Sequence, residues 1–202
     1  MAKLFQRPAE AHRSEMEIKN SRFITHIAPT RGADAARAFI DAIRSRHPDA
    51  SHNCWCYVAG APGDYNLWNS SDDGEPKGTA GKPMLNVLQH SGLGEATVVV
   101  TRYFGGIKLG AGGLVRAYSL AVQSALTTLQ TEQVIPTREI RVQAPHALTG
   151  PLEQLLRQLG LVVRHRHWGE RLELALELTD EQASELEQRL APYPDITLET
   201  ER

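Results

Sequence analysis

The sequence predicts an α+β protein of two domains, and two observations lead to that fold class. Segments with strand-like alternation of apolar and polar residues are interspersed with segments whose apolar residues recur every three or four positions, as in amphipathic helices. The pattern restarts after the linker-like stretch TEQVIPT, at residues 131–137. We therefore predict an N-terminal domain over residues 1–136 and a C-terminal domain over residues 137–202.

The N-terminal domain is predicted to mix strands and helices along the chain. Residues 17–28 are predicted to form a strand or a hairpin, and further strands are predicted at 51–60 and 95–104. The predicted helices lie at 33–47, from near Lys82 onward and at 112–130. The segment EATVVVTRYF has the valine run of a strand that is buried on both faces. Pro48 ends the first helical pattern, and Pro83 suits the first turn of the second helix.

The C-terminal domain is predicted to be ferredoxin-like. The segments REIRVQA, LVVRHRHW, RLELALELT and ITLET are strand-like, and helical patterns follow the first and third of them. Thr179 and Gln182 form a capping box that starts the second of these helices. The resulting order is β-α-β-β-α-β, which defines the ferredoxin-like arrangement.

Composition sets broad limits on function and location. The net charge of −2 over 202 residues gives no electrostatic sign of a polyanion partner. The two cysteines, Cys54 and Cys56, are too close in sequence for an unstrained disulfide. We see neither a secretory leader nor an apolar run of about 18 residues. We therefore expect a cytoplasmic protein without a membrane partner.

The segment TRYFGGIKLGAGGLVRAYS has five glycines between Gly105 and Gly113, after a strand and before a helix. Such a loop can direct backbone amides and the helix dipole at an anion. Cations that would add to this field are Arg102, Lys108 and Arg116. The spacing fits neither a Walker loop nor a dinucleotide fingerprint. The alternative, a tight turn with close helix packing, needs the same glycines without a ligand.

The segment SSDDGEPKGTAGKP combines acids with glycines. Asp72, Asp73 and Glu75 offer oxygen ligands of the kind that a divalent cation prefers. Their spacing differs from that of an EF-hand, and we favour the alternative of a turn whose acids cap backbone amides. Residues suited to an anion at the start of the following helix come next: Lys77, Thr79, Gly81 and Lys82.

Three segments in this order, SHNCWCYVAG, SSDDGEPKGTAGKPML and VVVTRYFGGIKLGAGGLVRAYS, closely resemble the IMPACT/YigZ family. The ferredoxin-like tail resembles the extra C-terminal domain of bacterial members. The resemblance implies an N-terminal βαβ domain with a left-handed crossover, like that of a ribosomal small-subunit protein and of domain IV of translocation elongation factors. It also implies a second domain like the last domain of those factors.

The resemblance and the loops together select the candidate site residues. The candidates for binding an anion or nucleic acid are Lys77, Thr79, Lys82, Arg102, Tyr103, Gly105, Gly106, Lys108, Gly110, Gly112, Gly113 and Arg116. The family's polar motif adds His52, Asp72, Asp73 and Glu75. Only one of the adjacent rings Tyr103 and Phe104 can face outward from a strand, and we expect that ring to stack on RNA bases.

We expect a non-enzymatic protein that binds phosphate, as RNA or nucleotide, and that is linked to translation or its regulation. Expected partners are RNA, the ribosome or a protein of the translation machinery. Eukaryotic relatives regulate translation under stress through a kinase pathway that bacteria lack, so that mechanism is not carried over. Two alternatives stay open: a phosphoryl-transfer or hydrolytic enzyme that uses the acidic and glycine loops, and a protein-interaction module. Apart from the cation considered at the acidic loop, we expect no cofactor.

Overall fold

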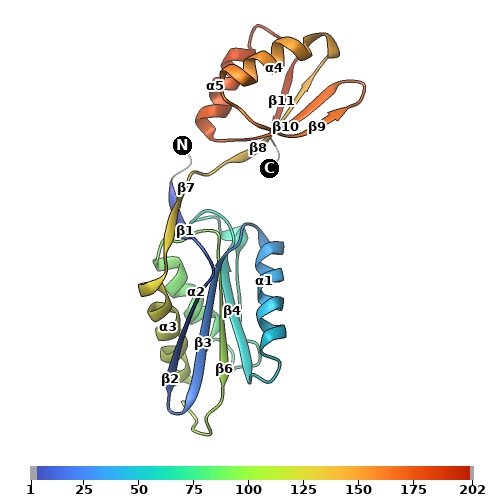
Figure 1. Ribbon diagram of the computed structural model, residues 1–202. Helices are drawn as coiled ribbons and strands as arrows, with labels where there is room; N and C mark the ends of the chain where they lie inside the picture. The colour runs from blue at the N-terminus through green and yellow to red at the C-terminus, as the bar shows by residue number, and fades with distance from the viewer. Residues whose placement is uncertain (1–3, 201–202) are drawn as a thin grey trace. The chain divides into compact units, whose positions relative to one another are not determined.

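The chain folds into two compact units, which are described separately (Figure 1). The computed structural model describes residues 4–200. The first unit comprises Phe5–Val134, and the second comprises the described residues from Ile135 onward together with Leu4. Each unit packs helices against an antiparallel sheet, which confirms the predicted α+β class.

The first unit is built on a five-stranded antiparallel sheet with the strand order β2-β3-β6-β4-β5. These strands are β2 (His12–Ile18), β3 (Ser21–Pro29), β4 (His52–Val58), β5 (Trp68–Ser71) and β6 (Ala96–Tyr103), and the helices are α1 (Ala33–Arg46), α2 (Gly81–His90) and α3 (Ala111–Thr128). Helix α1 covers one face of the sheet, and α2 and α3 lie side by side on the other (Figure 1).

The central strand β6 explains the valine run, because helices cover both of its faces. Val98 and Val100 belong to the core beneath α2 and α3, whereas Val99 belongs to the core beneath α1. All three side chains are fully buried. Side chains two positions apart on a strand share a face, so Arg102 faces α2 and α3 as Val98 and Val100 do. Its side chain therefore points into the interior.

The segment predicted as a linker is partly a strand. Thr131–Val134 forms β7, which pairs antiparallel with β1 (Phe5–Pro8), so that Phe5 lies opposite Val134. Arg7 on β1 forms ion pairs of 2.7 Å with Glu132 on β7 and with Glu95. The linker prediction is therefore wrong for Thr131–Val134, because a partner strand at the other end of the chain satisfies its backbone.

The second unit has the predicted ferredoxin-like order of elements. Its elements are β8 (Arg138–Ala144), α4 (Thr149–Gln158), β9 (Val163–Trp168), β10 (Leu172–Leu178), α5 (Asp180–Leu190) and β11 (Thr197–Thr200). The sheet order is β11-β8-β10-β9, and both helices pack on one face (Figure 1). Thr179 and Gln182 form the predicted capping box at the start of α5. Within residues 4–200, no helix has the length and apolar content needed to cross a bilayer.

Candidate functional site

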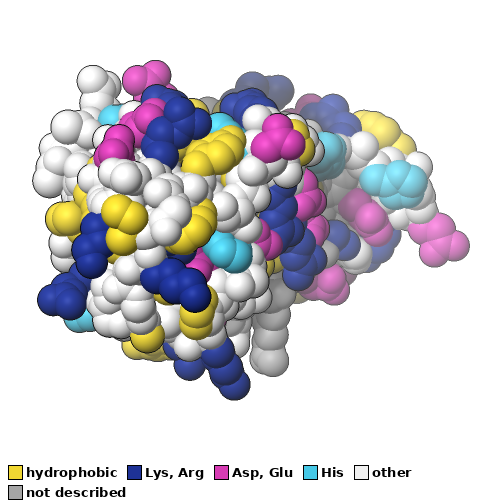
Figure 2. Space-filling model, turned by 90° about the horizontal axis from the view of Figure 1, so that it is seen from below, with side chains coloured by type: hydrophobic (Ala, Val, Ile, Leu, Met, Phe, Trp, Pro, Cys, Tyr) yellow, Lys and Arg dark blue, Asp and Glu magenta, His cyan; other side chains and the backbone are white. Residues whose placement is uncertain are grey.

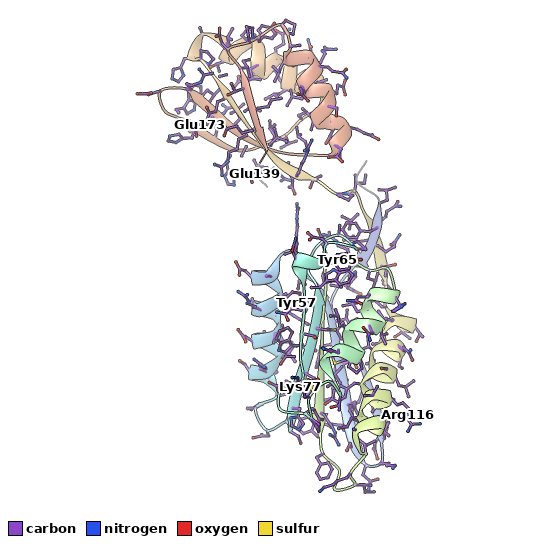
Figure 3. The ribbon with its side chains drawn as sticks, turned by 180° about the vertical axis from the view of Figure 1, so that it is seen from behind. Tyr57, Tyr65, Lys77, Arg116, Glu139 and Glu173 are labelled. Carbon is purple, nitrogen blue, oxygen red and sulfur yellow. The ribbon has the colours of Figure 1, made fainter. Side chains whose placement is uncertain are left out.

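The polar and glycine motifs meet at one end of the first unit, which we call the loop end. It comprises the start of β4, the loop from β5 to α2, the end of β6 and the loop from β6 to α3. In Figure 1 it lies at the lower end of this unit, and Figure 3 marks it with Lys77 and Arg116. His52 and Arg102 lie opposite each other on β4 and β6, which places both side chains on the face that α2 and α3 cover.

A buried ion pair lies at the centre of the loop end. Arg102 is 5% exposed and Glu75 is 7% exposed. A guanidinium nitrogen of Arg102 donates to Glu75 Oε1 over 2.6 Å, and the Tyr118 hydroxyl of α3 donates to the same oxygen over 2.8 Å. The second oxygen of Glu75 lies 3.8 Å from His52 Nε2. These contacts join β4, β6, α3 and the acidic loop.

The Asp73 carboxylate connects the acidic loop to α1 and β4. Its Oδ1 accepts from the Arg44 guanidinium of α1 over 2.5 Å, and its Oδ2 accepts from the backbone N–H of Asn53 over 2.6 Å. The Asp73 carbonyl oxygen lies 2.9 Å from His52 Nδ1. Because a carbonyl oxygen can only accept, His52 Nδ1 carries the proton of this bond. Asp73 thus fixes both the loop and the orientation of the His52 ring.

The Asp72 carboxylate caps α2. It accepts from the amides of Gly78, Ala80 and Gly81 over 2.7, 3.0 and 2.9 Å. Burial alone would raise the pKa of the Asp72 carboxyl, but these three amides and the charge of Lys82 outweigh it and hold the pKa below its ordinary value. Amide capping, the alternative that we favoured from the sequence, is therefore the role of Asp72.

Replacement of Asp72 by alanine is expected to lower the free energy of unfolding by about 1–2 kcal/mol at neutral pH, as for other lost N-terminal caps. The depressed pKa fixes the sign of the pH dependence. Stabilisation by Asp72 is complete above the unfolded-state pKa of about 4 and is lost as the pH falls through the folded-state pKa. Urea unfolding at pH 7 and pH 3 should show a gap between wild type and variant that shrinks at pH 3. A gap that stays constant with pH would contradict this assignment.

The three acidic side chains do not converge on a common point, which corrects the cation site considered from the sequence. Asp72 faces the amides of α2, Asp73 faces Arg44, and Glu75 faces Arg102. Among residues 4–200, no three histidine, cysteine, aspartate or glutamate side chains are placed to hold a metal ion. The spacing of the acids suggested a shared cation, but each acid has its own set of protein donors.

Arg102 is also placed differently from our expectation, because we assigned its guanidinium to a ligand and it is buried in the ion pair. Its guanidinium carbon lies 5.5 Å from the ring centroids of both Phe23 and Phe104. Phe104 is 49% exposed and covers the guanidinium from the solvent side. Phe104 is therefore the outward ring of the two candidates, and Arg102 supports it from behind.

Tyr103 points to the other face of the sheet, towards the end of α1. Its hydroxyl lies 2.8 Å from His47 Nδ1, and the Arg22 guanidinium lies 4.7 Å from its ring centroid. His47 in turn contacts His26, where burial, with the nearby charges of His47 and Arg13, lowers the pKa of His26 to about 4. Tyr103 is thus a packing residue of the α1 face.

The glycines of the loop before α3 have two different roles. A Cβ atom at Gly105 would lie 2.0 Å from backbone atoms of Asn20 in the β2–β3 turn, so Gly105 allows a close approach of two loops. Gly106 and Gly110 have φ angles of 84° and 72°, which favour glycine. In contrast, a Cβ atom at Gly112 would meet nothing within 4 Å, and Gly113 would contact only the Leu109 side chain.

The start of α3 is uncapped. No side chain caps this helix, and within residues 4–200 the amide hydrogens of Ala111, Gly112 and Gly113 have no acceptor. These amides carry the positive end of the helix dipole. The first turns of α3 are therefore chemically suited to a negatively charged group.

The cations of the loop end are exposed and form no direct salt bridge with a described carboxylate. Lys77, Lys82, Lys108 and Arg116 have no ion-pair partner among the described residues, and Arg116 Nε instead donates to the Gly112 carbonyl over 3.2 Å. Thr79, which we grouped with these cations, is buried and donates to the Pro76 carbonyl. Figure 2, which views the molecule from below, shows lysine and arginine side chains spread among apolar ones.

Sequence reasoning missed three residues that build the site: Ser21, Arg44 and Tyr118. The Ser21 hydroxyl accepts from Arg102 and from the Gly105 amide over 3.3 and 3.2 Å. Arg44 and Tyr118 lie on the helices α1 and α3. Helical periodicity predicts whether such residues are buried or exposed, but it does not predict their hydrogen-bond partners. The strand register that pairs His52 with Arg102 would have predicted the buried cluster.

The fold and the loop end define a two-unit protein whose first unit matches a known domain. Residues 19–126 match the model of the Impact N-terminal domain, and residues 142–191 match a domain of unknown function (DUF1949). The chain is 55% identical over 143 residues to IMPACT family member YigZ of Escherichia coli, covering 70% of each protein. It is 43% identical over 173 residues to an IMPACT family member of Haemophilus influenzae, covering 86% of this chain and 84% of the relative.

A solved structure, described as a crystal structure of a hypothetical protein, is similar over nearly the full length of both chains. It covers 100% of this chain and 99% of its own, with 41% identity and a TM-score of 0.82. The chain belongs to the IMPACT family. The family predicted from the three sequence motifs is thereby confirmed.

Proposed function

We propose that this chain is a non-enzymatic protein of translation that binds single-stranded RNA at the loop end. The observation that carries the proposal is the chemistry of one continuous segment. From Phe104 to Arg116 it holds an exposed ring, the cation Lys108, the free amides at the start of α3 and a second cation. Stacking on the ring and phosphate binding by amides and cations are the two interactions that single-stranded RNA requires.

The buried ion pair supports this arrangement from below. Because Glu75 neutralises Arg102, the charge beneath Phe104 is fixed within the protein, and the exposed lysines supply the field for a ligand. Asp73 is paired with Arg44, and Asp72 is hydrogen-bonded to backbone amides beside Lys82, so the acids of this loop oppose an anion less than the sequence suggests. The net charge of −2 predicts modest affinity, and the phosphate contacts make that affinity sensitive to salt.

The same contacts favour binding over phosphoryl transfer. An enzyme of that kind needs carboxylates that hold a metal ion or accept a proton from the substrate. Asp72, Asp73 and Glu75 each already accept two or more hydrogen bonds from protein donors. Burial also raises the pKa of the Cys54 thiol, which disfavours its use as a nucleophile.

The link to translation rests on the family. The resemblance implies that eukaryotic members regulate translation and that both domains resemble parts of ribosome-associated proteins. If the loop end binds RNA, a bacterial member could contact ribosomal or messenger RNA directly. This link to translation does not require the kinase pathway of eukaryotes. Fold-level likeness of this kind is an association, so RNA binding is the property to measure first.

Replacement of Phe104 by alanine is expected to weaken RNA binding by about 5-fold to 100-fold, the usual loss for one base-stacking ring. Lys108→Ala should weaken binding less and reduce the slope of log K against log salt by about 0.7. The measurement is fluorescence anisotropy of the full chain with a labelled twelve-nucleotide oligouridine at 50 and 200 mM KCl.

Tyr65→Ala is the matched ring control. Tyr65 is 74% exposed, and Figure 3 shows it at the opposite end of the first unit from Lys77 and Arg116. Arg37→Ala on α1 is the matched charge control. We expect both controls to bind RNA as the wild type does. Absence of binding at 50 mM KCl, or equal affinities for Phe104→Ala and wild type, would reject the proposal.

A further inference from the structure

A groove runs between α2 and α3 on the outer surface of the first unit. Its volume is about 770 Å³. It follows α2 from Lys82 to His90 and α3 from Val115 to Thr127, so it extends from the early turns of both helices to their last turns. The two helices run side by side and both begin at the loop end (Figure 1). The groove is therefore a channel between two parallel helices.

The groove is lined by apolar residues and by mostly uncharged polar side chains. Its apolar residues are Pro83, Val87, Val115 and Leu126, and its uncharged polar side chains are Asn86, Ser91, Ser119, Gln123 and Thr127. Among residues 4–200, no aspartate or glutamate lines it, Lys82 is its only lysine or arginine, and His90 lines the opposite end. Val115 is 36% exposed, so apolar surface remains in contact with water.

The electrostatic field along the groove has a direction. Lys82 and the uncapped amides of α3 lie at the end where both helices begin. Asp72 occupies the first amides of α2, so α3 and Lys82 supply the positive field there. The opposite end holds the C-termini of both helices, where helix dipoles are negative. An occupant should thus be apolar in the middle and acidic at one end only.

We propose that this groove binds an amphipathic helix of a partner protein, oriented antiparallel to α2 and α3. Ten residues of α2 span about 15 Å, which accommodates about three turns of a guest helix. Apolar residues at positions i, i+4 and i+7 of the guest would pack on Val87, Val115 and Leu126. Carboxylates in its C-terminal turn would face Lys82, and its own dipole would oppose those of α2 and α3.

A groove with a single cation fits a peptide better than a nucleic acid. RNA binding needs several cations along the backbone path, whereas the amide and hydroxyl groups here suit the rim of a helix-binding groove. The groove and the RNA site share the amides at the start of α3, but Ser119 and Gln123 lie on turns of α3 beyond the glycine loop and belong to the groove alone. The two ideas can therefore fail separately.

The test is a selection on the intact chain from a displayed library of helical peptides of about 16 residues, with apolar and charged positions randomised. Peptides are selected on the wild type, with counter-selection on Ser119→Trp, whose ring fills the middle of the groove. We expect the enriched peptides to share apolar residues at i, i+4 and i+7 and acidic residues in their last turn. Ser119→Trp should weaken their binding by about tenfold or more.

Two further variants keep the result interpretable. Lys82→Glu leaves the groove open and should weaken the same peptides by about 3-fold to 10-fold, while favouring peptides with lysine in the last turn. Ala38→Trp, on the exposed side of α1, adds an equal ring on the other face and should change nothing. The proposal is overturned if no helical pattern is enriched or if Ser119→Trp binds the enriched peptides as tightly as wild type.

Discussion

Replacement of Glu75 by leucine is expected to lower the free energy of unfolding of the first unit by about 3–5 kcal/mol, the range for breaking a buried ion pair from one side. The variant leaves the Arg102 guanidinium charged and 5% exposed, with the Ser21 hydroxyl at 3.3 Å as its remaining hydrogen-bond acceptor. It also removes the acceptor of the Tyr118 hydroxyl.

Urea unfolding followed by tryptophan fluorescence measures this effect. A Trp168→Phe background leaves Trp55 and Trp68, both of the first unit, as the reporters. The double variant Glu75→Leu with Arg102→Met should recover most of the loss, because both charges are then absent. Glu173→Ala, an exposed acid of the second unit labelled in Figure 3, is the control. A loss below about 1 kcal/mol in Glu75→Leu would show that water reaches Arg102.

Sequence patterns predicted the strands and helices in which apolar residues recur at a regular short spacing. The alternation of Leu172 to Leu178 predicted β10, and these leucines are buried against α4 and α5. The Thr179 capping box depends only on residues three positions apart, and it forms as predicted. The glycine segment was correctly placed between a strand and a helix, since β6 ends at Tyr103 and α3 begins at Ala111. Local rules suffice where the interaction itself is local.

Contacts between distant segments were beyond these rules. Strand β7 has only four residues and little apolar character, so its pairing with β1, about 125 positions away, leaves no local signature. The burial of Arg102 depends on Glu75 from another loop and on Tyr118 from α3. An arginine beside a glycine loop therefore resembled a ligand-binding residue, although its partner was an acid of the same chain. The favoured capping role holds for Asp72, whose donors follow it closely in the chain, whereas the arginine partners of Asp73 and Glu75 come from other elements.

Replacement of Gly105 by alanine is expected to lower the free energy of unfolding by about 3 kcal/mol, at the upper end of the range for overpacking. The new Cβ atom would lie 2.0 Å from the Asn20 carbonyl group, so the β2–β3 turn must move away. That movement would break the hydrogen bonds that Ser21 accepts from Arg102 and from the residue-105 amide. Amide hydrogen exchange should then show faster exchange in the turn and at the end of β6.

Gly112→Ala is the matched control, because it adds the same methyl group to the same glycine segment. A Cβ atom there meets nothing within 4 Å, and alanine in the first turn of α3 should change stability by less than about 1 kcal/mol in the stabilising direction. The control also distinguishes a structural role of a glycine from a ligand-binding role, because Gly112 lies among the free amides of α3. If Gly105→Ala proved as stable as Gly112→Ala, the close approach of the two loops would not contribute to the fold, and Gly105 would be open to a ligand-binding role.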